Sequence, residues 1–317
     1  MAKMTIDTLK AKTAAYVTAA KQAGTWTAST DNFLGLVDKV GKQITIDGNF
    51  QDKLPEMNGD DLPLGKTIEE WFIDLTLPSD YDATGANTMA PHMPTVEDCA
   101  YNYSLGRKVI ATTQRYDNVE RAAITAEDAG NMMAKIIQRL YDSQSLYTYA
   151  QKKQLLANVI AKASTSGSPL VANVELPVDT LSAEAFIKQV KADVEEASFA
   201  SENTSLGKTL IGAAPELVLY VKKGVMPTVE VDALAGAFQE NKLAIPAKVV
   251  VVDDFGNDNS GAFAVLADPR GIKLHNDYRA IREQLNAEGD FINFFLHTEY
   301  TGFISKNSYV KVYKPQA

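Results

Sequence analysis

One long helical segment in the middle of this 317-residue chain constrains the fold more than any other feature. Thr125 is a good N-cap, and Asp128 follows three residues later, as in a capping box. Apolar residues then recur at helical spacing: Ala129, Met132, Met133, Ile136, Ile137, Leu140 and Tyr141. The pattern predicts helix to about Ala163, with room for a break between Ser143 and Ser145. Such a helix is ~50 Å or more in length at ~1.5 Å per residue, which is long for a domain of this size.

The region before this helix predicts a two-stranded arm of roughly fifty residues. Residues Thr67–Leu77 are rich in aromatic and β-branched types, which favour a strand. Residues 83–94, ATGANTMAPHMP, read as a tip of glycine, proline and small residues. Residues 95–116 then predict the returning strand, in which Tyr101, Tyr103 and Leu105 alternate.

The arm cannot bury both of its faces by itself, because an isolated two-stranded ribbon is marginal in water. Trp71 and Phe72 are neighbours in the strand and point to opposite faces, so at least one is exposed in a lone subunit. Two arrangements follow. Either the arm folds back onto its own domain, or it lies on a neighbouring subunit.

The second half of the chain mixes helices and strands. The pattern predicts a helix capped by Ser182 with Phe186, Val190 and Val194 on one face, and a buried strand over Glu216–Val221. It also predicts a helical piece over 229–242 and a hairpin over 247–268 with an acidic turn.

The chain closes with a predicted hairpin over Ile292–Lys314, whose turn is Ser305–Ser308. In its long strand one face carries Phe294, Leu296, Thr298 and Tyr300, and the other carries Phe295, His297 and Glu299. His297 is expected to be a packed or interface residue. Gly302 inside the strand indicates a bulge or a close backbone contact.

A search for chemistry finds one candidate loop, which contains Asp253, Asp254, Asp258 and Asn259. Oxygen-rich loops can bind Ca²⁺, but the spacing is not that of an EF-hand, and these residue types are also favoured in tight turns. Carboxylates for glycoside cleavage could come from Glu69, Glu70, Asp253 or Asp254, and nothing in the sequence selects a pair. The three histidines (His92, His275 and His297) lack metal-site spacing. We therefore predict no catalytic, cofactor or metal site.

Composition excludes several classes of protein. The formal net charge is −9 and no dense Lys/Arg run occurs, which argues against a protein that grips nucleic acid, although not against one that merely encloses DNA. Cys99 is the only cysteine, so no disulfide can form within the chain. No apolar run reaches the ~18–20 residues that span a bilayer, so no membrane association is expected.

The order of these elements resembles that of the major capsid proteins of tailed bacteriophages, which have the Hong Kong 97 fold. The most specific part is residues 261–314, a strand, a short connection, a long aromatic and charged strand and a final strand. The resemblance implies an α+β fold with four parts: an N-terminal arm (1–48), an extended β-hairpin or E-loop region (49–115), a peripheral P-domain with a long spine helix (116–204 and 286–317), and an axial A-domain (205–285). The closing hairpin would complete the P-domain sheet.

The function that this resemblance implies is structural. Copies of the chain would form pentamers and hexamers of an icosahedral head shell around double-stranded DNA, with no catalytic role and no cofactor. The implied interface residues are Trp71, Phe72, Tyr101 and Arg107, with the E-loop lying across a neighbour. Implied partners are other copies of the chain and separate scaffolding, portal and decoration proteins, and assembly would occur in the cytoplasm of a bacterial host.

Two alternatives remain open from the sequence. Encapsulins, the shells of bacterial nanocompartments, share this fold and would enclose a cargo protein instead of DNA. A soluble hydrolase that uses the loop at Asp253 and Asp254 is the alternative from a different class.

Overall fold

The computed structural model describes residues 50–63, 67–73, 76, 78, 91, 93–94, 96–101, 103–115, 126–165, 170–201, 210–211, 216–226, 245–256 and 261–316. The N-terminal arm, most of the tip at 83–94, the helical piece at 229–242, and Thr125, Asp258 and Asn259 lie outside these residues. The chain divides into two compact units. Unit 1 comprises Met1–Lys53, Gly106–Gln151 and Asn276–Tyr300, and unit 2 comprises Leu54–Leu105, Lys152–His275 and Thr301–Ala317.

The predicted long helix is confirmed as α4, which runs unbroken from Ala126 to Thr165. The break considered between Ser143 and Ser145 is wrong. Ser143 is accommodated because its hydroxyl donates to the Arg139 carbonyl one turn earlier, at 2.8 Å. At ~1.5 Å per residue this helix is about 60 Å long.

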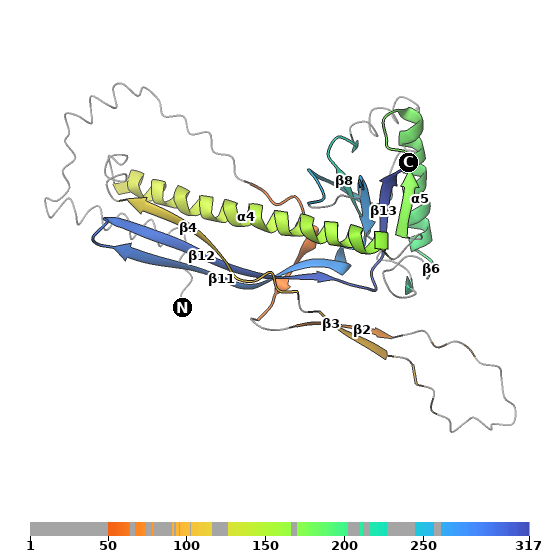
Figure 1. Ribbon diagram of the computed structural model, residues 1–317, viewed down its shortest axis with the longest axis horizontal. Helices are drawn as coiled ribbons and strands as arrows, with labels where there is room; N and C mark the ends of the chain where they lie inside the picture. Colours follow the sequence, from red (N-terminus) through yellow and green to blue (C-terminus); the bar gives the residue numbers. More distant parts are fainter. Residues whose placement is uncertain are drawn as a thin grey trace. The chain divides into compact units, whose positions relative to one another are not determined.

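In unit 1, α4 lies along a sheet formed by β4 (Lys108–Arg115), β12 (Phe291–Ile304) and β11 (Ile272–Asn286), as Figure 1 shows. The sheet order is β1-β11-β12-β4, where β1 is Asn58–Asp61. Ile137 and Leu140 of the helix pack on Phe294 and Leu296 of β12. The predicted alternation of β12 is confirmed, since its core face is buried throughout: Phe294, Leu296, Thr298 and Tyr300.

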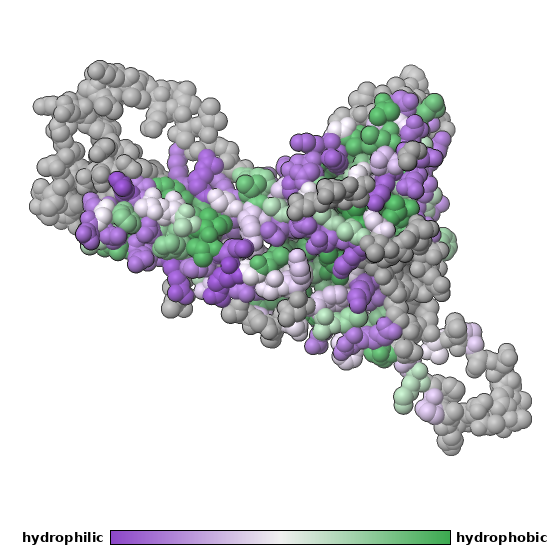
Figure 2. Space-filling view, in the orientation of Figure 1, coloured by the Kyte–Doolittle hydropathy of each residue, from purple (hydrophilic) through white to green (hydrophobic). Residues whose placement is uncertain are grey.

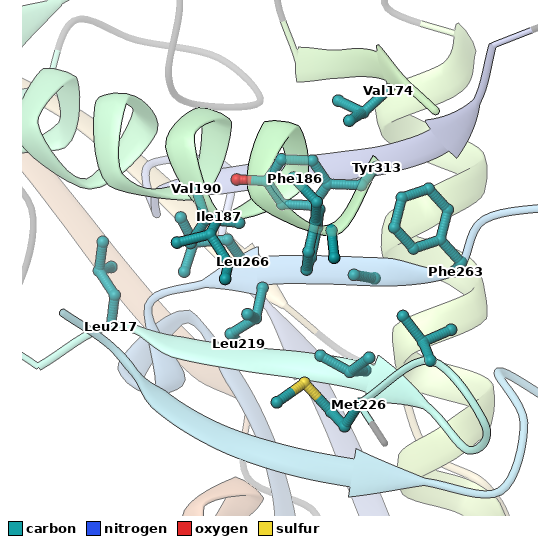
Figure 3. Packing of buried hydrophobic residues seen from close by; sticks show 14 of the residues in the cluster. Val174, Phe186, Ile187, Val190, Leu217, Leu219, Met226, Phe263, Leu266 and Tyr313 are labelled. Atoms are coloured by element: carbon teal, nitrogen blue, oxygen red, sulfur yellow. The ribbon is translucent and has the colours of Figure 1, made fainter. Parts of the chain in front are cut away.

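Unit 2 holds the main core beneath helix α5 (Thr180–Ala197). Its five-stranded sheet has the order β5-β13-β10-β8-β9. The strands are β5 (Val171–Val174), β13 (Val310–Pro315), β10 (Ala264–Ala267), β8 (Val218–Lys222) and β9 (Lys248–Val252). Phe186, Ile187 and Val190 of α5 point onto this sheet (Figure 3), which confirms the predicted apolar face of that helix.

The cap of α5 differs from the prediction. Asp179 is the N-cap and accepts from the Ser182 backbone N–H at 2.8 Å, while the Ser182 hydroxyl accepts from the Asp179 N–H at 3.1 Å. The helix thus begins earlier than predicted, because the pair forms a reciprocal capping box with an aspartate in the first place.

Two predicted hairpins are wrong, and one predicted strand is divided in two. Residues 247–268 are not a hairpin, because β8 lies between β9 and β10 and pairs with both. The closing segment is not a hairpin either, since β12 pairs with β4 whereas β13 pairs with β10 and β5. The returning strand of the arm is two strands, β3 (Val96–Tyr101) and β4, separated by Gly106 at φ 72°.

Smaller elements complete the described chain: the 3₁₀ turns η1 (Pro55–Met57) and η4 (Pro269–Gly271), and the strand pair β6 (Ala200–Ser201) and β7 (Leu210–Ile211). No helix in the described ranges is both long enough and apolar enough to cross a membrane. Hydrophilic and hydrophobic residues are interspersed on the face shown in Figure 2.

Candidate functional site

The predicted arm contains a short antiparallel hairpin of unit 2, formed by β2 (Ile68–Ile73) and β3. Its register places Trp71 opposite Asp98 and Ile73 opposite Val96, while Glu70 lies opposite Cys99. Residues directly opposite each other share a face of a sheet. The hairpin therefore has an outer face that carries Trp71 and an inner face that carries Glu70.

The outer face carries an apolar cluster that is open to solvent, beside the exposed carboxylates of Glu69 and Asp98. The exposed fractions are 68% for Trp71, 55% for Ile73 and 49% for Val96, and these three side chains lie on the same side of the two strands. Hydrophobic residues of this hairpin are visible at the surface in Figure 2. Exposed apolar groups that cluster in this way mark interaction sites more often than isolated ones do.

The inner face is half-buried and is anchored by one carboxylate. Glu70 accepts hydrogen bonds from the Tyr101 hydroxyl, at 2.7 Å, and from the Ser305 hydroxyl. The same two hydroxyls accept from backbone N–H groups, Tyr101 from Lys306 at 3.2 Å and Ser305 from Asn307 at 2.9 Å. Burial, and then the hydrogen bond to Glu70, raise the pKa of the Tyr101 phenol above its ordinary value.

Packing supports the same contact. The Tyr101 ring meets Phe303 edge to face, with 5.0 Å between ring centroids. Nearby, the Gly302 N–H donates to the Tyr103 carbonyl at 3.0 Å. A Cβ at Gly302 would lie 2.8 Å from Leu155 and 2.9 Å from Tyr103. The close contact predicted at Gly302 is confirmed.

The segment that leads into the hairpin is held by lysines of the same unit. Lys152 is fully buried in α4, and its ammonium donates to the Leu54 carbonyl at 2.8 Å and to the Asn58 amide oxygen at 2.6 Å. Lys273 donates to the Glu56 carbonyl at 2.8 Å. These charge-assisted bonds fix the chain shortly before β2.

The four predicted interface residues do not form one group. Trp71, Phe72 and Tyr101 lie on the hairpin, with Trp71 exposed on its outer face and the other two half-buried on its inner face. Arg107 lies in unit 1, where its guanidinium bonds to Glu299 at 3.1 Å and stacks 4.4 Å above the Tyr278 ring. Its side chain is 46% exposed, and Arg107 stays an interface prediction.

In the described part of the acidic loop, Asp253 and Asp254 make a structural contact with α4. Lys153 of α4 bonds to Asp253 at 3.0 Å and to Asp254 at 2.9 Å. Burial by itself would lower the pKa of Lys153, but its bonds to the two carboxylates outweigh burial and raise it. Gly256, at φ 62°, allows the loop to approach the Lys153 backbone. In the described part of the chain no three His, Cys, Asp or Glu side chains gather to hold a metal ion.

The sequence prediction missed two features of the hairpin. Ile73 and Val96 extend the outer face beyond Trp71, and the alternation of β2 could have identified the first of them. The contact between Glu70 and Ser305 had no local signal, because the two residues are 235 positions apart.

Comparison with known sequences gives a consistent result. The family described as Phi29-like phage major capsid protein matches residues 7–309. The major capsid protein of Bacillus phage PZA is 24% identical over 290 residues, which cover 89% of this chain and 63% of that protein. That of Bacillus phage B103 is 24% identical over 277 residues, covering 86% of this chain and 60% of that protein. The chain thus spans less than two thirds of the length of these relatives.

Solved structures support the fold. A chain in the capsid structure of Staphylococcus phage Andhra superimposes with a TM-score of 0.70 at 11% identity, covering 87% of each chain. A chain of the mature capsid of bacteriophage PhiM1 gives a TM-score of 0.59 at 10% identity, covering 86% of this chain and 90% of that one. The mixed sheets and few helices described above are therefore those of a phage capsid fold.

Proposed function

This chain belongs to the family of Phi29-like phage major capsid proteins, and we propose that its copies assemble into the pentamers and hexamers of an icosahedral shell around double-stranded DNA. The observation that supports assembly best is the outer face of the β2–β3 hairpin. Its apolar residues Trp71, Ile73 and Val96 are exposed together in the single subunit, and clustered exposed apolar groups mark interaction sites.

The occupant that we assign to this face is a second copy of the chain. Each copy would give its hairpin to one neighbour and receive a hairpin from another, which is a head-to-tail interface that closes into a ring. Interfaces of ~1,200–2,000 Å² are modest one at a time, but ring closure makes them cooperative.

The domain assignment is part of the proposal. The β2–β3 hairpin belongs to the extended loop, and α4 with β4, β11 and β12 forms the P-domain. The pairing of β13 with β5 and β10 supports moving β5, α5 and β13 from the P-domain to the A-domain. The pairing of β11 with β12 supports moving β11 in the opposite direction.

The remaining partners follow from the same proposal. An acidic chain, with net charge −9, lets enclosed DNA slide along the inner surface instead of binding to it. Scaffolding, portal and decoration proteins, and assembly in the cytoplasm of a bacterial host, stay predictions from the family resemblance.

The test is Trp71→Ala in protein produced with the products of the neighbouring genes. We expect shells or rings from the unchanged protein, seen by negative-stain electron microscopy and sedimentation velocity. Trp71→Ala should leave a folded but unassembled subunit, because 68% of that side chain is exposed before assembly. Trp71→Phe keeps an aromatic anchor and should assemble.

Two results would contradict the proposal. Normal shells from Trp71→Ala would show that this face is not an interface between copies. A small oligomer that never assembles and loses a hydrolytic activity on Asp254→Asn would favour the hydrolase. We expect Asp254→Asn shells to form normally, because Asp254 is half-exposed and its charge pairs with Lys153.

A further inference from the structure

The root of the β2–β3 hairpin is held by a small network centred on Glu70. Its carboxylate joins three segments: its own strand β2, Tyr101 of β3, and Ser305 in the connection between β12 and β13. All three segments belong to unit 2. The contact with Ser305 spans 235 positions, so it ties the hairpin to the core rather than to a neighbour in sequence.

The network is directional. Tyr101 and Ser305 each donate a hydroxyl proton to Glu70, and each accepts a backbone N–H from the connection, from Lys306 and Asn307 respectively. A carboxylate that accepts hydrogen bonds from two hydroxyl groups polarises both of them. This strengthens the hydrogen bonds that the hydroxyl oxygens accept in turn. Loss of the carboxylate therefore loosens both sides of the contact together.

We infer that Glu70 is a latch that fixes the direction of the hairpin in the free subunit. The hairpin's outer face carries Trp71 and Ile73, and the latch lies on the opposite face, so it leaves the apolar residues available. Because the latch consists of hydrogen bonds at a half-buried site, it can open without disrupting the core under α5. The hairpin can then adjust to different neighbours once the Glu70 network opens and the Tyr101 ring shifts on Phe303.

The role of the latch in assembly rests on the proposed function, but the latch itself does not. The latch is a property of the free subunit, so it can be tested whether or not shells form. Hydrogen exchange followed by mass spectrometry on the unassembled protein measures the local opening of each segment.

The decisive comparison is Glu70→Gln against Glu69→Gln. Both changes remove one negative charge from adjacent positions of β2, but the Glu69 side chain lies on the exposed outer face. Hydrogen bonds to a charged group are strong enough that Glu70→Gln should speed exchange of the hairpin about tenfold to a hundredfold. Glu69→Gln should change it by less than about twofold. Peptides of β8 and β10 should exchange at the original rate in both variants.

A second pair of variants tests the same network if Glu70→Gln fails to fold. Tyr101→Phe keeps the ring against Phe303 and removes one hydroxyl, so its exchange should be several-fold faster, less than for Glu70→Gln. Ser305→Ala removes the other hydroxyl, and combined with Glu70→Gln it should add little, because both changes open the same network.

The outcomes separate the two proposals. Equal exchange in Glu70→Gln and Glu69→Gln overturns the latch, and so does faster exchange that reaches β8 and β10. A loosened hairpin together with fewer or misshapen shells supports the latch and its role in assembly. A loosened hairpin with normal shells overturns only that role, whereas normal shells from Trp71→Ala overturn the interface.

Discussion

The core under α5 and the β2–β3 hairpin belong to the same unit but use similar residues in opposite ways. β8 and β10 bury apolar side chains on both faces of the sheet. The hairpin leaves Trp71, Ile73 and Val96 exposed. Each buried apolar Å² contributes about 25 cal/mol to folding, so residues of the core stabilise the subunit, whereas those of the hairpin are available to stabilise an assembly.

Both regions also contain a hydrogen bond from a tyrosine hydroxyl to a carboxylate, but the two bonds differ in burial. In the core, the buried carboxylate of Asp193 accepts from the Tyr313 hydroxyl at 2.7 Å, and its backbone carbonyl accepts from Tyr309 at 2.9 Å. At the hairpin, Glu70 and Tyr101 make the same kind of pair at a half-buried site. The core pair is locked by burial and the hairpin pair is not, which is the difference expected between a fixed element and a movable one.

The largest expected effect comes from the core. Phe186 is fully buried and its ring lies 5.4 Å from that of Phe263 and 5.5 Å from that of Tyr313. We expect Phe186→Ala to lower the free energy of unfolding by about 3–5 kcal/mol, measured by chemical denaturation of the unassembled subunit. A change under 1 kcal/mol would mean that this core is not what holds unit 2 together, and the contrast drawn above would fail.

The second prediction concerns alkaline pH. Burial, and then nearby carboxylate charge, raise the pKa values of Tyr220, Tyr309 and Tyr313 above that of a free tyrosine. The folded protein keeps these protons where the unfolded chain, with a tyrosine pKa of about 10, releases them. Stability should therefore be constant with respect to these groups below about pH 10. Above that pH it should fall by about 1.4 kcal/mol per pH unit for each group.

Tyr313→Phe provides the control for that titration. The variant loses a hydrogen bond to Asp193 at every pH. In addition, the fall in its free energy of unfolding above pH 10 should be less steep, by the contribution of one tyrosine. Urea midpoints between pH 8 and 11 measure both effects. A slope that stays unchanged would show that the Tyr313 phenol reaches solvent in the folded state.

The third prediction sits between the two regions, at Gly302. A Cβ there would press on Leu155 at 2.8 Å and on Tyr103 at 2.9 Å, so Gly302→Ala should cost about 1–3 kcal/mol through overpacking. Leu155 is buried, so Leu155→Ala alone should cost about 2–5 kcal/mol. The double variant should cost less than the sum of the two single changes, because the added methyl group fills part of the space that Leu155 leaves. Full stability in Gly302→Ala alone would show that the chain near the hairpin root relaxes easily.

The sequence predicted what depends on local periodicity and missed what depends on distant pairing. The long helix and the alternation of Phe294 and Leu296 were predictable because a repeat along the chain shows which face is buried. Two hairpins predicted from adjacent strands failed, because β8 lies between β9 and β10, and β12 and β13 join different sheets, whereas the hairpin of the arm is found as β2–β3. Which strand pairs with which is decided by contacts far apart in sequence, and no single segment encodes them.

The same limit applies to the candidate site. Opposite faces for Trp71 and Phe72 were predictable from strand geometry, and the exposure of Trp71 agrees with the sequence analysis. The anchor at Ser305 was not, since a serine in a turn has no feature that points to a glutamate 235 residues away. All four interface residues stay predictions until assembly is measured, and Arg107 also has contacts within its own unit.

The smallest effect on folding is expected at Ile73. A change there should affect assembly but not the stability of the subunit, which is the opposite of the effect expected in the core. Ile73 is 55% exposed, so Ile73→Ser should change the free energy of unfolding by no more than about 0.5 kcal/mol. If the outer face meets another copy, the same change places a hydroxyl in an apolar contact and should reduce the yield of shells severalfold. Leu181→Ser is the control, because Leu181 is exposed to a similar or greater extent on α5, away from β2 and β3 in the chain. Equal loss of shells in both variants would mean that any exposed apolar residue affects assembly, and that the outer face of the hairpin is not a specific interface.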